Sequence, residues 1–194
     1  MNADTGKTRA GARRTGEGRL PGDPTPREIV ARTIRVDHAG EYGAKRIYQG
    51  QIDVLRGTKW EPLIRHMQEQ EQVHLDTFSR LIPERRVRPT ALQPLWNVAG
   101  FALGAATALM SEQAALACTD AVETEIDRHY ADQLAEIGED DPELAADILE
   151  FQAEELEHRD SARTAGAANA IGYPILTATI RAGCRLAIEL SKRI

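Results

Sequence analysis

The sequence predicts an all-α protein whose centre is a bundle of four helices. From Pro26 onward the apolar residues recur at intervals of three and four positions, and no segment alternates between apolar and polar residues as a strand would. The motif Glu-x-x-His occurs twice, at residues 71–74 and 155–158. A glutamate precedes each copy, Glu41 by 30 residues and Glu123 by 32. Each half of the chain therefore supplies one helix with a glutamate and one helix with the motif, and two halves make four helices.

The composition limits the classes of protein. A chain of 194 residues is long enough for one domain with a tail. Its net charge of −6 is modest and offers no basic face for nucleic acid. The two cysteines, Cys118 and Cys184, form no CxxC pair, which argues against a zinc site or a disulfide framework. The phosphate-binding patterns GxGxxG and GxxxxGK followed by Ser or Thr are both absent.

Residues 1–25 are predicted to form a disordered, mildly basic tail, so the folded domain spans residues 26–194. No bulky apolar residue occurs between Met1 and Leu20, and a segment without such residues cannot pack a core. The tail lacks the apolar region of a signal peptide, and its arginines lie on no amphipathic face as they would in a transit peptide. These features favour a cytoplasmic start in a bacterial protein.

The first half of the predicted bundle consists of two amphipathic helices. The first begins behind Thr25, with Pro26 at its first position, and runs to about Gly57. Its inward stripe consists of Val30, Ile34, Asp37, Glu41, Ala44, Tyr48, Ile52 and Leu55. The second runs from about Glu61 to Ile82. Its stripe consists of Ile64, Met67, Glu71, His74, Phe78 and Leu81.

The second half repeats this arrangement. A link with Pro83, Pro89 and Pro94 leads to a long apolar stretch, which is expected to continue directly into the third bundle helix. The stripe of that helix consists of Leu116, Thr119, Glu123, Ile126, Tyr130 and Leu134. After a turn at residues 138–142 comes the fourth helix, with the stripe Leu144, Ile148, Phe151, Glu155, His158 and Ala162. Gly172 and Pro174 introduce a last helix.

Each of the four stripes is interrupted near its middle by an acid or an imidazole. An isolated buried carboxylate is prohibitively costly, so four of them indicate bound cations. Two divalent cations balance the charge of four glutamates and leave the histidines neutral. The predicted metal ligands are Glu41, Glu71, His74, Glu123, Glu155 and His158. This ligand set is known from ferritin-like di-metal carboxylate bundles, and its oxygen and nitrogen donors suit iron or manganese better than zinc. With six ligands for two ions, Glu71 and Glu155 are predicted to bridge.

Other polar residues lie on the stripes or close to them. Four glutamates fall off the inward stripes and are predicted to be surface charge: Glu69, Glu125, Glu154 and Glu157. Asp37, one turn before Glu41, either orients a ligand histidine or lies on the helix surface. Tyr130, the candidate catalytic residue, either forms a hydrogen bond near the metals or fills the core.

Two segments are apolar beyond what a four-helix core requires. Residues 89–111 carry no charge and approach the length of a membrane span, but Pro94 and several polar and small residues favour a helix that lies at the membrane interface and roofs a channel to the metals. Gly100 and Gly104 form a GxxxG spacing, a weak signal for close helix contact. The last helix is basic and amphipathic, so it either lies on an anionic bilayer or packs against the bundle.

Several longer motifs carry a resemblance to a known family. They are RVDHAGEYGAKRIYQGQ at 35–51, ALGAATALMSEQAALACTDAVE at 102–123, EELEHRD at 154–160 and AGCRLAIELSKR at 182–193. Together with the first Glu-x-x-His motif, they resemble the demethoxyubiquinone hydroxylases, the Coq7/Clk-1 proteins of ubiquinone biosynthesis, over about residues 27–194. RVDHAGEYGA is much more specific than the spacing Glu-x-x-His, which ferritins share.

The resemblance implies a ferritin-like di-iron monooxygenase bound peripherally at the cytoplasmic face of the inner membrane. Such an enzyme uses O2 to hydroxylate the C6 ring position of a polyprenyl demethoxyubiquinol, with two iron ions per chain on the same six ligands. The family implies NADH as the electron donor without a flavin, and a Coq9-like lipid-binding partner. The alternative is a ferritin-like or rubrerythrin-like protein that handles iron or peroxide. A ferritin shell is not expected to carry the uncharged stretch, and a rubrerythrin would add a CxxC iron site.

Overall fold

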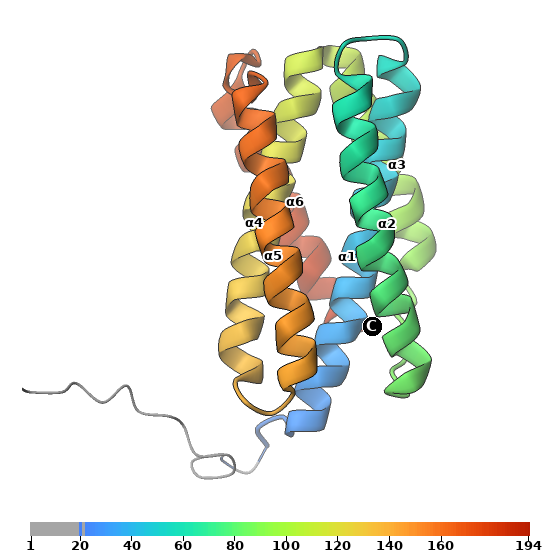
Figure 1. Cartoon of the computed structure of the whole chain (residues 1–194), viewed down its shortest axis with the longest axis vertical. Helices are drawn as coiled ribbons and strands as arrows, with labels where there is room; N and C mark the ends of the chain where they lie inside the picture. The colour runs from blue at the N-terminus through green and yellow to red at the C-terminus, as the bar shows by residue number, and fades with distance from the viewer. Residues whose placement is uncertain (1–19, 21) are drawn as a thin grey trace, which may run out of the picture.

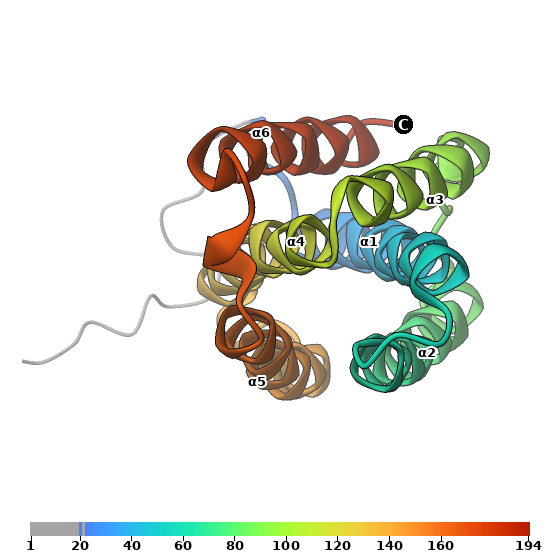
Figure 2. The ribbon, with the colours of Figure 1, turned by 90° about the horizontal axis from the view of Figure 1, so that it is seen from above.

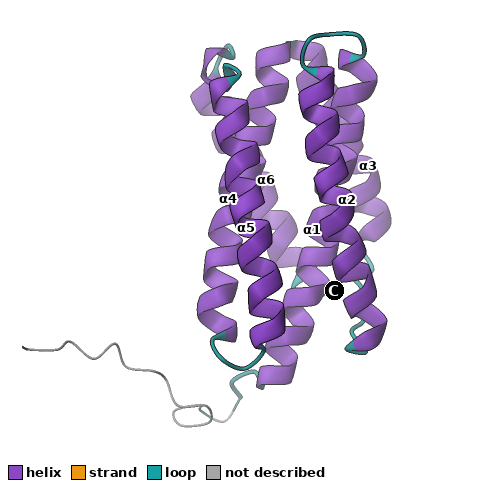
Figure 3. Ribbon diagram, in the orientation of Figure 1, coloured by secondary structure: helices purple, strands orange, loops and turns teal. Residues whose placement is uncertain are grey.

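The computed structural model describes residue 20 and residues 22–194, and this part of the chain is helical without a strand (Figures 1 and 3). Its helices are α1 (Pro26–Leu55), α2 (Glu61–Glu84), α3 (Gln93–Met110), α4 (Glu112–Ile137), α5 (Pro142–Thr164), the short 3₁₀ helix η1 (Ala167–Asn169) and α6 (Tyr173–Ser191). The all-α prediction is confirmed. The predicted disordered tail falls almost entirely on residues 1–19 and 21, which lie outside the described residues.

Helix α1 begins at the residue that the sequence predicts. The Thr25 hydroxyl accepts a hydrogen bond from the backbone N–H of Glu28, and the Glu28 carboxylate accepts one from the N–H of Thr25 at 2.8 Å. This reciprocal capping box satisfies two of the donors that a helix leaves open at its N-terminus. Pro26 occupies the first turn, where its missing N–H costs nothing.

The helices form three layers, which are clearest in the end-on view of Figure 2. Helices α1 and α4 lie in the middle, with α2 and α5 on one side and α3 and α6 on the other. α1 packs on α2 and α3, whereas α4 packs on α5 and α6. Among the described residues, α2 and α5 do not pack closely on each other. The four bundle helices therefore surround a core in which the backbones of α2 and α5 do not approach closely, and side chains such as Phe78 and Phe151 fill the distance between them.

Two apolar clusters lie at the two ends of the bundle core. One contains Ile34 of α1, Phe78 of α2 and Phe151 of α5, and the other contains Ile52 of α1 and Met67 of α2. On α1 and α2 alike, the polar stripe positions lie between the residues of the two clusters. The polar layer is thus held at mid-height and sealed from solvent at both ends.

The apolar stretch 89–111 does not continue into the third bundle helix, so this part of the prediction is wrong. Ser111 ends α3 and begins α4 in an extended conformation, and its hydroxyl accepts a hydrogen bond from the N–H of Ala114 at 3.0 Å. A serine at a helix N-terminus is a common cap, and Glu112 behind it suits the first turn of a helix, but the long apolar run before Ser111 conceals the break in the sequence. α3 therefore turns back and packs along the outer face of α1.

Close contact between α1 and α3 depends on glycines, as the GxxxG spacing indicates. A Cβ atom on Gly104 would overlap the backbone carbonyl of Ile47, and one on Gly100 would lie 2.8 Å from the carbonyl oxygen of Gly43. The contact is reciprocal, because a Cβ on Gly50 of α1 would overlap the backbone of α3. Absence of a side chain at these positions lets the two backbones touch.

Helix α6 covers the outer face of α4 and buries a charge there. Glu125, predicted to be surface charge, is only 2 % exposed and accepts hydrogen bonds from Arg181 at 2.6 Å and Arg185 at 2.7 Å. This prediction is wrong because helical periodicity identifies one inward face, whereas α4 is covered on two sides. Glu69 and Glu157 are exposed, as predicted. No described helix is both long and apolar enough to cross a bilayer.

Candidate metal centre

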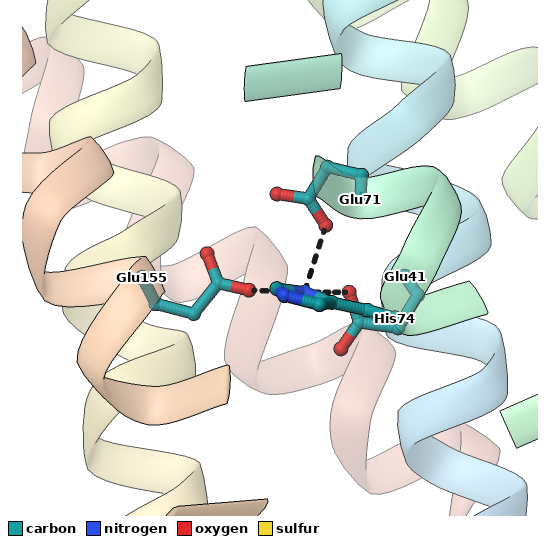
Figure 4. Close-up of side chains that lie close together, drawn as sticks. All are labelled: Glu41, Glu71, His74 and Glu155. Carbon is teal, nitrogen blue, oxygen red and sulfur yellow. Dashed lines mark ion pairs between the residues drawn. The ribbon is translucent and has the colours of Figure 1, made fainter. Parts of the chain in front are cut away.

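The six predicted ligands meet in the middle of the bundle, and none of them is more than 2 % exposed. They form two groups, in each of which one ligand atom per residue lies within 4.8 Å of the others. Position A is the group Glu41, Glu71, His74 and Glu155, shown in Figure 4. Position B is the group Glu71, Glu123, Glu155 and His158. Glu71 and Glu155 belong to both groups, and these are the two residues that the sequence predicts as bridges.

The hydrogen bonds within the cluster leave a set of buried atoms without partners. They are Glu41 Oε2, both carboxylate oxygens of Glu71, His74 Nδ1, Glu123 Oε2 and Glu155 Oε1. Buried polar atoms are nearly always paired in native proteins, because leaving one unpaired costs free energy. All of these atoms are oxygen or imidazole nitrogen, the donors that suit first-row divalent cations. The residues present therefore fit a pair of bound metal ions.

Two tyrosines hold the outer glutamates from opposite halves of the bundle. The Tyr48 hydroxyl of α1 donates to Glu123 Oε1 of α4 at 2.6 Å, and the Tyr130 hydroxyl of α4 donates to Glu41 Oε1 of α1. Each outer glutamate thus has one oxygen held and the other unpartnered. Tyr48 was expected only in the apolar stripe. Its role could have been found in the repeated spacing, since each tyrosine follows the glutamate of its own helix by seven residues.

The two ligand histidines have partners across the α2–α5 opening. Nε2 of His74 lies 2.6 Å from a carboxylate oxygen of Glu154, and Nε2 of His158 lies 3.0 Å from the amide oxygen of Gln70. Glu154 was predicted to be surface charge, and its side chain is still 34 % exposed, but the sequence did not predict its contact with a ligand histidine. Because α2 and α5 are not closely packed, a side chain beside the inward stripe can reach across. Gln70 was missed, although it precedes its ligand glutamate just as Glu154 does.

Asp37 does not orient either ligand histidine and does not lie on the surface, so neither sequence alternative holds. It is buried beside Glu41, accepts a hydrogen bond from Gln133 at 2.6 Å and lies 3.5 Å from Nε2 of His129. Burial raises the pKa of Asp37 above its ordinary value, against the opposing effect of His129. The sequence stripe places Asp37 inward correctly, but it could not show which histidine lies opposite.

The electrostatics of the cluster show how strongly these groups act on one another. Burial and the neighbouring carboxylates raise the pKa values of Glu71 and Glu123 well above the ordinary range. Burial lowers the pKa of His74, but the carboxylates of Glu155 and Glu41 beside its ring outweigh burial and raise the pKa to about 11. Burial raises the pKa of Glu155, but the neighbouring rings of His158 and His74 outweigh burial and bring the pKa to about 2. Cations that bind here must therefore displace protons.

Comparison with known proteins identifies the family. Residues 28–191 match the family model described as ubiquinone biosynthesis protein COQ7. The chain is 53 % identical over 194 residues to a 3-demethoxyubiquinol 3-hydroxylase of Rhodospirillum rubrum, covering 100 % of this chain and 92 % of that protein.

Eukaryotic relatives are similar over most of their length. The chain is 51 % identical over 176 residues to the human mitochondrial NADPH-dependent 3-demethoxyubiquinone 3-hydroxylase, covering 89 % of this chain and 81 % of that one. Identity to the mitochondrial 5-demethoxyubiquinone hydroxylase of Saccharomyces cerevisiae is 42 % over 183 residues, covering 86 % and 78 %. The chain belongs to the COQ7 family of ubiquinone biosynthesis proteins.

Proposed function

We propose that the chain is a di-iron monooxygenase that hydroxylates the C6 ring position of a polyprenyl demethoxyubiquinol. The observation that carries the proposal is the pair of buried ligand groups sharing Glu71 and Glu155, whose unpartnered oxygens call for cations. The relatives support the substrate, since the bacterial, human and yeast proteins are all named as hydroxylases of demethoxyubiquinol or demethoxyubiquinone.

The proposed reaction replaces a ring C–H bond by C–OH. One atom of O2 enters the new hydroxyl, the other leaves as water, and a reduced nicotinamide nucleotide supplies two electrons. The family resemblance implies NADH as the electron donor, whereas the human relative is named NADPH-dependent. Both nucleotides are therefore tested in the experiment below. Bound iron supplies the one-electron chemistry that O2 requires.

The side chains of this protein have separate tasks in the proposal. Glu71 and Glu155 would hold both ions, while each of the remaining four residues would hold one: Glu41, His74, Glu123 and His158. Tyr48 and Tyr130 each occupy one oxygen of an outer glutamate, so that each glutamate presents its second oxygen. Contact with Glu41 supports a positioning role for Tyr130, and its action on the substrate stays a prediction.

Substrate access from a membrane is the second part of the proposal. Exposed apolar side chains gather on the layer formed by α3 and α6: Leu95, Val98, Leu109, Met110, Ile175 and Leu186. The basic residues of the last helix were expected to meet lipid phosphates, but two of them, Arg181 and Arg185, donate hydrogen bonds to Glu125 instead. Membrane binding is therefore assigned to the apolar side chains. A polyprenyl tail is insoluble in water, and a protein lying on the bilayer through this layer meets it there. The cytoplasmic face and a Coq9-like partner stay predictions.

The proposed reaction is tested with purified, iron-loaded protein, a demethoxyubiquinol and ¹⁸O2. We expect one labelled oxygen atom in the new ring hydroxyl, detected by mass spectrometry, with oxidation of the nicotinamide nucleotide. NADH and NADPH are supplied in parallel reactions. The ferritin-like or rubrerythrin-like alternative predicts instead that O2 or peroxide is consumed while the quinol ring stays unlabelled. That second result, obtained with full iron loading, would overturn the proposal.

Membrane access is tested with a matched pair of substitutions. Leu109 on α3 and Leu149 on α5 are 75 % and 60 % exposed, but they lie on opposite layers. We expect Leu109→Glu to weaken liposome binding at least about tenfold, because it removes an apolar side chain and adds a charge to the membrane-facing layer. Turnover of a long-tailed quinol should fall with it, while iron content and turnover of a short-tailed quinol are retained. Leu149→Glu should change none of these, and equal losses in both variants would contradict the proposed membrane face.

A further inference from the structure

The two ligand histidines are held by unlike acceptors at equivalent places in the two halves. Glu154 directly precedes the ligand Glu155, and Gln70 directly precedes the ligand Glu71. Each reaches across the opening to the histidine of the other helix. Glutamate and glutamine have almost the same size and shape, so the main difference between the two partners is one negative charge.

The geometry determines which nitrogen of each histidine faces the metals. Nδ1 of His74 lies 3.3 Å from Glu155 and 3.5 Å from Glu41 and has no hydrogen-bond partner. Nδ1 of His158 likewise faces the cluster, 3.2 Å from Glu155. The Nε2 atoms point outward, and an ionised carboxylate such as that of Glu154 can only accept a hydrogen bond. With Nε2 carrying the hydrogen, the lone pair on Nδ1 faces the carboxylates of the cluster and would be available to a bound ion.

The two acceptors act differently on the imidazole. A hydrogen bond to an ionised carboxylate is shorter and stronger than one to a neutral amide, in line with 2.6 Å for Glu154 against 3.0 Å for Gln70. A carboxylate that accepts from the outer N–H also makes the inner nitrogen a stronger donor to a metal. Positions A and B offer the same set of ligands. Each has one histidine, one glutamate that accepts a hydrogen bond from a tyrosine, and the two shared glutamates.

We propose that Glu154 makes the two metal positions inequivalent. Position A, which contains His74, binds a divalent cation more tightly and is filled first, and position B, which contains His158, is the weaker of the two. Glu154 acts through His74 and is a positioning residue rather than a ligand. The inference rests on the metal centre of the proposed function, but it makes a claim that the proposed function does not need.

Reciprocal substitutions test the proposal on the full chain. Glu154→Gln gives both histidines an amide partner, Gln70→Glu gives both a carboxylate, and the double variant exchanges the two partners. The metal-free protein is titrated with Co(II), followed by its visible absorption. We expect two phases in the native chain, separated by roughly 10–100-fold in affinity, the usual effect of such an outer partner. The phases should merge in each single variant and separate again in the double variant.

Iron-loaded protein supplies a second measurement that does not depend on the order of filling. In Mössbauer spectra of the fully ⁵⁷Fe(II)-loaded chain we expect two quadrupole doublets of equal area. The two doublets should become indistinguishable in Glu154→Gln and should be resolved again in the double variant. General damage to the fold would not be repaired by a second substitution, so recovery in the double variant distinguishes positioning from structural support.

The possible outcomes separate this inference from the proposed function. If the native chain shows one doublet and one titration phase, the inequivalence is overturned while a hydroxylase with two equal irons stands. If Glu154→Gln leaves the separation unchanged, the role of Glu154 is overturned, and the proposed function again stands. A chain that binds neither Co(II) nor iron overturns both. Labelled hydroxylation of the quinol by Glu154→Gln with merged doublets would support both.

Discussion

Glu71→Ala is expected to remove nearly all iron from the purified protein, whereas Glu41→Ala should keep about one of the two ions. Glu71 belongs to both ligand groups, and both of its oxygens are buried without a partner. Losing it therefore weakens positions A and B together. Glu41 belongs to position A alone and presents a single oxygen there, so its loss leaves position B with all four ligands.

The number of iron ions per chain, measured by elemental mass spectrometry, checks this expectation. Hydroxylation should fall below detection in Glu71→Ala. Glu155→Ala should resemble Glu71→Ala, because Glu155 is the other shared residue. Glu69→Ala is the matched control, since Glu69 is an exposed glutamate on the same helix. Equal iron contents in Glu71→Ala and Glu41→Ala would show that Glu71 does not bridge.

Gly104→Ala should destabilise the fold by about 3 kcal/mol or more, an effect at the upper end for an overpacked site. The added methyl would overlap the backbone carbonyl of Ile47, and a backbone atom cannot move aside as a flexible side chain can. α3 must then separate from α1, its most extensive partner in the fold. For a domain of this size such a loss lowers the melting temperature by about 6–12 °C.

Thermal unfolding followed by circular dichroism measures the change, with Gly183→Ala as the control. Gly183 lies inside helix α6, and a Cβ atom there meets nothing within 4 Å. Alanine is the better helix former by about 1 kcal/mol, so this variant should be unchanged or slightly more stable. If Gly104→Ala melted at the same temperature as Gly183→Ala, the close approach of α1 and α3 would be wrong.

The stripes of the sequence predicted the fold class and six side chains that the structure places together, because a carboxylate or imidazole on an otherwise apolar face is a strong signal. Which of these residues are shared by two positions was also predicted, from their central place in each half. The metals themselves and the role of each ligand stay predictions, which the iron measurements test.

The errors have a common physical origin. Glu125 and Glu154 lie beside the stripes, and their surroundings depend on neighbours that periodicity does not identify. α6 covers Glu125, and the loosely packed α2–α5 side lets Glu154 reach His74. Hydrogen-bond partners such as Tyr48 and Gln70 were equally hidden, because a single helix pattern cannot show what stands opposite. The repeat, read position by position, would have revealed both.

The crossed tyrosines follow the rule of a two-fold axis. In a symmetric pair of subunits, if one residue of the first touches another residue of the second, the reverse contact also occurs. Glu41 and Tyr48 of α1 stand in this relation to Glu123 and Tyr130 of α4, although all four belong to one polypeptide. Neither half satisfies its own outer glutamate. A cut between α3 and α4 would leave two fragments that can rebuild the centre only by associating with each other.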